Sequence, residues 1–139
     1  MPIQHNTLAV YVDGGSRGNP GPSGGGFAVL KGGKLVHKGS QFFGLKTNNQ
    51  AEYMALKLAL QTVHEKFGDG ETAVDCFMDS QLVVEQMSGN WRVKNANILP
   101  LFREARKIAD QFKSFTISHV AREENYLADN LANQAMDRG

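Results

Sequence analysis

Residues 7–26, TLAVYVDGGSRGNPGPSGGG, decide the fold of this chain of 139 residues. The first part, residues 7–13, has the Val, Leu and Tyr content of a buried strand and ends in Asp13. The rest, residues 14–26, is rich in glycine and carries two prolines, which predicts irregular structure. Because glycines let another backbone come close, a strand that ends in an acid beside them makes Asp13 a candidate site residue.

Two more strands are expected directly after this stretch. Residues 27–31 and 34–43 flank Gly32 and Gly33, which are a typical hairpin turn signal. The chain therefore opens with an antiparallel meander of three strands.

Beyond the meander, apolar residues recur mainly at helical spacing. Asn48 is a plausible N-cap for a helix that ends near Phe67, and Asp79-Ser80 could cap a short helix through Met87. Further helices are predicted over residues 98–112 and 125–136, and short strands over residues 72–78 and 115–120. The apolar faces expected for the first and last helices are Ala51, Met54, Ala55, Leu58 and Val63, and Leu127, Leu131 and Ala135.

The order of these elements predicts an α/β fold. Residues 72–78 form a short apolar strand of the type buried on both faces. A strand, a crossover helix and another strand imply parallel pairing. We therefore expect a mixed five-stranded sheet, a three-strand antiparallel meander plus two parallel strands, flanked by helices. No repeat or linker divides the chain, so residues 1–139 are expected to form a single domain.

Composition limits the possible partners and compartments. The net charge is only +1, so contact with nucleic acid would need a local basic patch rather than the field of the whole molecule. Cys76 is the single cysteine, which excludes an internal disulfide and is typical of a buried small residue. No apolar run approaches the ~20 residues that cross a bilayer, and residues 1–7 lack the apolar core of a signal peptide. We therefore expect a cytoplasmic location.

Four acids stand where elements begin or end. Asp13 ends the first strand, Glu52 lies in the first turn of the first long helix, Asp79 follows the fourth strand, and Asp129 lies one turn into the last helix. If the first and fourth strands are parallel neighbours, Asp13 and Asp79 share one edge of the sheet. Each acid alone also has an ordinary structural explanation, as a turn residue, helix cap, dipole partner or surface charge.

The sequences around the four acids resemble the four motifs of type 1 ribonuclease H. They are residues 11–21 (YVDGGSRGNPG), 47–52 (TNNQAE), 79–83 (DSQLV), and 119–132, which contain HVAR, Asn125 and ADNLA. The resemblance runs from about Leu8 to Ala135, in the family's order and without a large insertion. Coincidence of four motifs in register is a poor explanation.

The resemblance implies a ribonuclease H-like fold and endonucleolytic hydrolysis of the RNA strand of RNA/DNA hybrids, which leaves 5′-phosphate and 3′-hydroxyl ends. It implies two divalent ions, Mg²⁺ or Mn²⁺, roughly 3.5–4 Å apart. Asp13 and Asp79 would serve both ions, Glu52 the first and Asp129 the second. Carboxylates without a Cys or His cluster suit such hard cations, and crowded acids repel one another without them.

Two candidates for assisting the chemistry remain open. Many family members use a loop histidine before the last acid, and His119 has a compatible spacing from Asp129, but we expect it at the end of a strand. Arg122 lies closer in the loop and could instead steady the scissile phosphate or the leaving group. We rank Arg122 slightly ahead of His119.

Substrate contacts also follow from the resemblance. Asn19, Asn48 and Gln81 match positions that contact the hybrid in its minor groove, where 2′-hydroxyls distinguish RNA from DNA. Thr47 with Asn48 resembles a pocket for a DNA-strand phosphate, for which a helix N-cap is the structural alternative. A loop suited to the DNA strand carries Trp91, Arg92, Lys94 and Asn95. Core packing remains an alternative for Trp91.

The chain departs from the better-known bacterial pattern between Met87 and Leu99, where there is no room for a Lys-rich helix and loop. This predicts weaker or more salt-sensitive hybrid binding and a likeness to compact forms of archaea, some bacteria and plants. No separate hybrid-binding domain is expected before the catalytic one. The expected partner is an RNA/DNA hybrid, with RNA/RNA duplexes left open. We expect a monomer without membrane contact or an obligate protein partner.

Other functions explain the sequence less well. A phosphate-cradling loop is excluded for residues 14–26 because no Gly-Lys-Ser/Thr follows. A hybrid-binding module that has lost catalysis would lack at least one of the acids. A transposase or junction resolvase on the same fold would need extra domains or a dimer interface.

Overall fold

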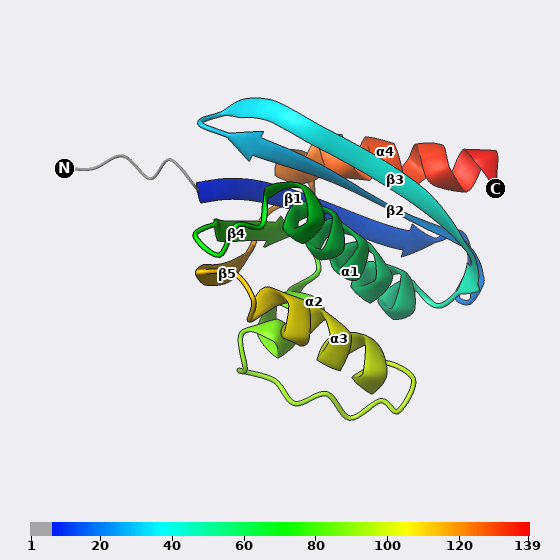
Figure 1. Cartoon of the computed structure of the whole chain (residues 1–139). Coiled ribbons are helices and arrows are strands. Elements are labelled where there is room, and N and C mark those ends of the chain that lie inside the picture. The colour runs from blue at the N-terminus through cyan, green and yellow to red at the C-terminus, as the bar shows by residue number, and fades with distance from the viewer. Residues whose placement is uncertain (1–6) are drawn as a thin grey trace.

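Five strands form one mixed sheet over residues 7–139, which are the residues that this computed structural model describes (Figure 1). The strands are β1 (Thr7–Ser16), β2 (Gly21–Lys31), β3 (Lys34–Lys46), β4 (Ala73–Met78) and β5 (Ser114–His119). The helices are α1 (Asn48–Phe67), α2 (Gln81–Met87), α3 (Leu99–Ala109) and α4 (Tyr126–Arg138), and a short 3₁₀ helix, η1 (Arg122–Asn125), precedes α4. The expectation about a signal peptide falls on residues outside the described ones, apart from Thr7.

The strand order is β3-β2-β1-β4-β5, with antiparallel pairing in the meander and parallel pairing of β1 with β4 and of β4 with β5. The predicted mixed sheet is confirmed. Helix α4 lies on one face of the sheet, and α1 lies on the other with α2 and α3 beyond it (Figure 1).

The prediction of irregular structure for residues 14–26 was wrong for most of that stretch. β1 continues to Ser16, β2 begins at Gly21, and Gly14 pairs with Gly25 across the two strands. The glycines are needed for close packing. A Cβ on Gly25 would lie 2.6 Å from the Ala55 Cβ of α1, and one on Gly26 would lie 2.5 Å from the Leu131 Cβ of α4. Helices therefore approach β2 closely on both faces.

The buried faces of the helices differ from the predicted stripes for the same reason. Ala128, Ala132 and Ala135 of α4 are buried, whereas Leu127 and Leu131 are only half-buried. The predicted Ala135 is thus confirmed, whereas the two leucines lie off the buried face because small residues allow α4 to approach the glycines of β2. In α1, which packs between the sheet and α3, the predicted Ala51, Ala55 and Val63 are buried, whereas the predicted Met54 and Leu58 are half-buried. The other large buried residues of α1 are Tyr53, Leu56 and Leu60.

β4 was predicted to be buried on both faces, and this was wrong. Val74, Cys76 and Met78 are buried, but the alternating residues on the other face, Asp75 among them, are half-buried. Helix α4 packs on β1, β2 and β3, which leaves that face of β4 more open.

Some helix boundaries also differ from the predicted ones. The N-cap of α1 is Thr47 rather than Asn48: its hydroxyl accepts the Gln50 N–H at 3.2 Å, and the Gln50 side chain accepts the Thr47 N–H at 2.9 Å. α3 is shorter than predicted, and α4 begins after η1. No helix within residues 7–139 is both long and apolar enough to span a membrane.

Candidate active site

Parallel pairing of β1 with β4 brings two of the acids together. Val12 aligns with Met78 in that pairing, and the next residues along the chain are Asp13 and Asp79. Both carboxylates therefore lie at the carboxyl edge of the central strands, where ligand sites of open α/β sheets form.

Glu52 reaches the same edge because α1 rests directly on β1. A Cβ on Gly14 would overlap the backbone carbonyl of Ala51, so only glycine allows this approach. The capping box at Thr47 fixes where the helix begins, one turn before Glu52. Ser80, which caps α2 just after Asp79, also hydrogen-bonds to Glu52.

Asp129 is positioned through a buried asparagine at the start of α4. Asn125 is 1% exposed, and its Nδ2 donates to the carbonyl of Val12 at 2.8 Å. This bond ties the start of the last helix to the residue before Asp13. Asp129 lies in the first turn of that helix, and its side chain reaches Asp13. Asn125 therefore sets the spacing of the first and last acids.

The acids border a cleft of about 290 Å³ whose lining includes Asp13, Glu52, Asp79 and Arg122. Asp129 lies beside it, 3.6 Å from an Arg122 nitrogen, with its side chain 24% exposed. The structure thus gathers acids from β1, α1, α4 and the end of β4 at one place.

Electrostatics in the cleft oppose full ionisation of these acids. Burial, followed by charge repulsion from Asp79 and contacts with Asp129, raises the pKa of Asp13 to about 8. Burial and repulsion from Asp79 raise the pKa of Glu52 to about 7, although the Ser80 hydrogen bond lowers it. Negative charge is concentrated here beyond what protein groups neutralise.

The donor set fits hard divalent cations. Carboxylate oxygens are the ligands that Mg²⁺ and Mn²⁺ prefer, and a cation would relieve the repulsion that raises both pKa values. In the described part of the chain, no three Asp, Glu, His or Cys side chains already form a compact metal-binding cluster. The carboxylates border a shared cleft rather than a closed cage, which leaves room for substrate oxygens.

The two candidates for assisting the chemistry lie in different places. Arg122 begins η1 and lines the cleft, with its side chain 74% exposed and its charge near Asp129. His119 is exposed at the end of β5 and does not line the cleft. The structure brings Arg122 to the cleft, whereas His119 is outside its lining.

The expected minor-groove residues Asn19 and Asn48 hold each other in place. The Asn48 N–H donates to Asn19 Oδ1 at 3.0 Å, and Asn48 Oδ1 accepts the Ser16 N–H at 3.2 Å. Asn48 lines the cleft, and Asn19 lies on the exposed turn between β1 and β2. Thr47 has the helix-capping role that was its structural alternative.

The remaining expected substrate residues are exposed but do not line the cleft. Gln81 is the first residue of α2. The segment between α2 and α3 carries Trp91, Arg92, Lys94 and Asn95. Trp91 is 45% exposed, which excludes core packing, and its backbone N–H donates to the Glu85 backbone carbonyl at 3.1 Å.

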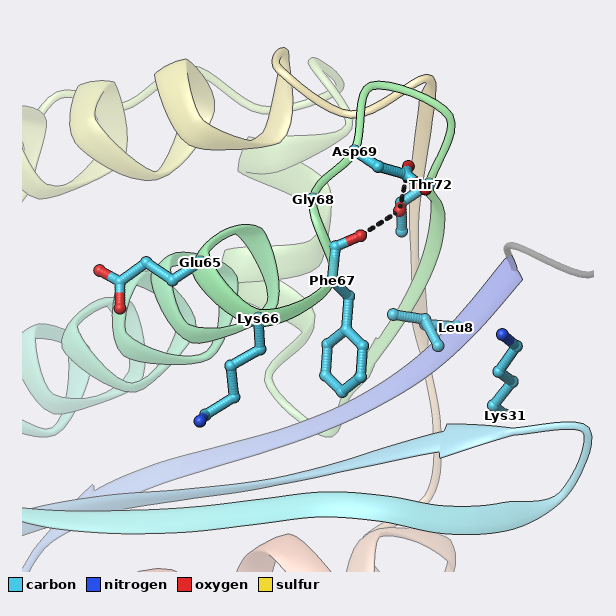
Figure 2. A pocket seen from close by; sticks show the side chains of 8 residues that line it. All are labelled: Leu8, Lys31, Glu65, Lys66, Phe67, Gly68, Asp69 and Thr72. Atoms are coloured by element: carbon cyan, nitrogen blue, oxygen red, sulfur yellow. Dashed lines mark hydrogen bonds between the residues drawn. The ribbon is translucent and has the colours of Figure 1, made fainter.

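A second hollow, of about 330 Å³, lies at the opposite end of the sheet, beside the end of α1 (Figure 2). Lys31 and Lys66 border it, and the side chains of Thr72 and Asp69 in its wall are hydrogen-bonded within the protein. The Thr72 hydroxyl donates to the Phe67 carbonyl at 2.6 Å and to Asp69 Oδ1 at 3.1 Å (Figure 2). These bonds close the end of α1 onto β4, which is a structural role.

Sequence reasoning missed several residues of the cleft. Ser16, Arg17, Asn133 and Met136 also line it. Asn133 follows Asp129 by four positions, a spacing that places both on one helix face and could have revealed it. Arg17 gave no such signal, because its neighbourhood was expected to be irregular.

Comparisons with known proteins agree with this geometry. Residues 11–135 match the family model described as reverse transcriptase-like. The chain is 39% identical to ribonuclease HI of Halobacterium salinarum over 138 residues, covering 99% of this chain and 68% of that protein. It is 45% identical over 132 residues to a bifunctional protein of Mycobacterium tuberculosis, of whose length it spans 35%.

Solved structures show the same fold. The N-terminal RNase H domain of the M. tuberculosis protein has a TM-score of 0.89 at 42% identity, with 95% of this chain and 94% of that chain covered. LC11-RNase H1, solved in complex with an RNA/DNA hybrid, also has a TM-score of 0.89, at 38% identity, with 94% and 97% covered.

Proposed function

This chain belongs to the type 1 ribonuclease H family, and we propose that it hydrolyses the RNA strand of RNA/DNA hybrids at the cleft bordered by Asp13, Glu52, Asp79 and Asp129. The proposal includes metal-dependent endonucleolytic cleavage that leaves 5′-phosphate and 3′-hydroxyl ends.

The observation that carries this proposal is the convergence of the four acids. They come from separate elements, and each is set by a specific packing feature: parallel register for Asp13 and Asp79, the Gly14 contact for Glu52, and the Asn125 bond for Asp129. Holding repelling carboxylates together destabilises a protein, so their arrangement supports a functional role.

Two Mg²⁺ or Mn²⁺ ions bound there would activate water and stabilise charge on the leaving oxygen. Asp13 and Asp79, which follow the paired residues Val12 and Met78, would serve both ions. Glu52 lies on the α1 side of the cleft and Asp129 on the α4 side, so each would complete one metal site.

Arg122 would steady the scissile phosphate or the leaving group. Its guanidinium is exposed, lines the cleft and lies near Asp129, and a planar guanidinium suits bidentate binding of phosphate oxygens. His119 is the less favoured candidate because it lies at the end of β5 and does not line the cleft.

Asn19, Asn48 and Gln81 would contact the minor groove of the hybrid, and Thr47 with Asn48 a phosphate of the DNA strand. The first two asparagines already share a hydrogen bond beside the cleft. The exposed segment with Trp91, Arg92, Lys94 and Asn95 would contact the DNA strand by stacking and charge.

We further propose that the domain acts as a monomer in the cytoplasm. Recognition through backbone shape and 2′-hydroxyls would also admit double-stranded RNA as a weaker substrate.

The test is cleavage of an RNA/DNA hybrid labelled at the RNA 5′ end, with Mg²⁺, Mn²⁺ or EDTA. Wild type and Asp13→Asn are compared, with duplex RNA, duplex DNA and single strands as parallel substrates. We expect metal-dependent internal cuts in the RNA of the hybrid and a loss of at least about 10³-fold in Asp13→Asn.

Asp110→Asn is the matched control because it makes the same chemical change in an exposed surface ion pair. It should cut like wild type. A hybrid that is bound but uncut with every metal would overturn the catalytic assignment and support a binding module.

A further inference from the structure

Arg17 is a cation of the cleft that the proposed chemistry does not use. It stands on the turn between β1 and β2, two residues before Asn19, and lines the same cleft as the carboxylates. One guanidinium nitrogen lies 2.5 Å from Asp137 of α4, and another lies 3.5 Å from the Asn133 carbonyl. The side chain therefore crosses from the turn to the last helix beside the acids.

These contacts do not lock the guanidinium. The Arg17 and Asp137 side chains are 47% and 64% exposed, and an ion pair so open to water contributes only about 0–1 kcal/mol. The contact with Asn133 is at the limit of a hydrogen bond. A phosphate offers two charge-assisted bonds to the planar guanidinium, so it competes well with a single exposed carboxylate.

Charge in the cleft gives a reason for such an exchange. Among the described residues that line the cleft, the cationic side chains are Arg17 and Arg122, against three carboxylates. Arg122 lies near Asp129, whereas Arg17 extends from the opposite strand turn toward the last turns of α4. A polyanionic strand entering an acidic cleft needs cations beside the reacting phosphate, and these two arginines line that cleft.

We propose that Arg17 binds a phosphate of the RNA strand next to the scissile one, and that Asp137 competes with this phosphate for the guanidinium and so weakens substrate binding. This deepens the proposed function and rests on it. The RNA strand is assigned because Arg17 lines the cleft of the carboxylates on the side where it contacts α4, whereas the DNA-strand contacts proposed above lie at the start of α1 and beyond α2.

A purely structural role makes the opposite prediction for one variant. If the pair only docks α4 onto the strand turn, removing either partner should loosen that contact, and neither variant should bind better. If Asp137 competes with phosphate, Asp137→Asn should bind better while Arg17→Gln binds worse.

The experiment measures KM and kcat for hybrid cleavage, and hybrid affinity in EDTA by fluorescence anisotropy, between 50 and roughly 200 mM salt. Variants are Arg17→Gln, Arg17→Lys, Asp137→Asn and the double variant. Glu71→Gln is the matched control, because it removes an acid from another exposed ion pair, with Lys113, at the far end of β4.

We expect Arg17→Gln to raise KM about tenfold with little change in kcat, and to reduce the salt dependence by about one charge. Asp137→Asn should lower KM about threefold, more than Glu71→Gln does, and should have no effect in the Arg17→Gln background. Arg17→Lys should recover part of the affinity.

The proposal would be overturned if Asp137→Asn changed KM and hybrid affinity no more than Glu71→Gln does, or if it bound the hybrid more weakly than wild type. A set of hybrids, each with one phosphate replaced by a neutral methylphosphonate, then locates the phosphate that Arg17 binds. Arg17→Gln should bind as well as wild type only to the hybrid in which one particular RNA phosphate is replaced. If the loss of affinity disappears only when a DNA phosphate is replaced, the strand assignment is overturned. Because anisotropy needs no cleavage, a wild type that binds without cutting would reject the proposed function and still leave the Arg17 contact measurable.

Discussion

Asp13→Asn should stabilise the metal-free protein while abolishing its activity. Surroundings that raise the pKa of Asp13 from 3.8 to about 8 disfavour its ionised form. At pH 7 this corresponds to a penalty on the order of 4 kcal/mol. Because the cleft is open to water, which screens part of the repulsion, we expect a net gain of about 2 kcal/mol. For a chain of this size, that raises the Tm by about 6 °C.

The pH dependence has a definite sign. The folded protein holds the Asp13 proton up to about pH 8, whereas the unfolded chain releases it near pH 4. Wild-type stability therefore falls as pH rises between these values, and the Asn variant escapes that loss. Its advantage should be less than half as large at pH 5 as at pH 8. Saturating Mg²⁺ should shrink or reverse the stability advantage of Asp13→Asn. The wild type keeps all four carboxylates and should therefore gain more stability from binding the metal.

Urea denaturation in EDTA at pH 5, 7 and 8, repeated with Mg²⁺, measures these differences. Asp110→Asn, on an exposed pair, should change stability by less than about 0.5 kcal/mol at each pH. An Asp13→Asn variant that is less stable than wild type in EDTA, or whose advantage does not change with pH, would refute the electrostatic account of the cleft.

Three further predictions concern packing and burial. Gly26→Ala should lower the free energy of unfolding, measured by urea denaturation, by about 1–3 kcal/mol, because the added Cβ would lie 2.5 Å from Leu131 Cβ. Gly15→Ala is the control and should destabilise the protein far less, because its Cβ meets only a side-chain oxygen at 3.5 Å. Asn125→Ala should cost about 1–3 kcal/mol by leaving the Val12 carbonyl without its partner, and a kcat unchanged from wild type would argue against its spacing role. Cys76 should resist a thiol reagent until urea unfolds the chain, since burial raises its pKa to about 12.

The sheet and the central acids could be predicted because they depend on local signals. Strand content, the Gly32-Gly33 turn and the crossover helices predict a mixed five-stranded sheet, and the apolar runs of β1 and β4 lead into Asp13 and Asp79, although β1 itself continues to Ser16. Parallel pairing then places the two acids together without knowledge of any distant contact.

What could not be predicted depends on contacts between distant segments. Gly25 and Gly26 resemble loop residues until two helices are placed against them, and the alanine face of α4 is preferred only because those glycines leave no room for larger side chains. Arg17 is recognisable as part of the cleft only once α4 lies beside it, since its partner Asp137 is far away in the sequence. Neither the periodicity of apolar residues nor the secondary-structure propensity of each residue contains information about such close approaches.

The hydrogen bond from Asn125 to the Val12 carbonyl joins residues 113 positions apart. Contacts of such long range form late, because the entropy of closing so large a loop must first be overcome. During synthesis, the strand that carries Asp13 leaves the ribosome long before the helix that carries Asp129. The cleft therefore lacks Asp129 until α4 has been made, even if the three acids from β1, α1 and the end of β4 are already in place.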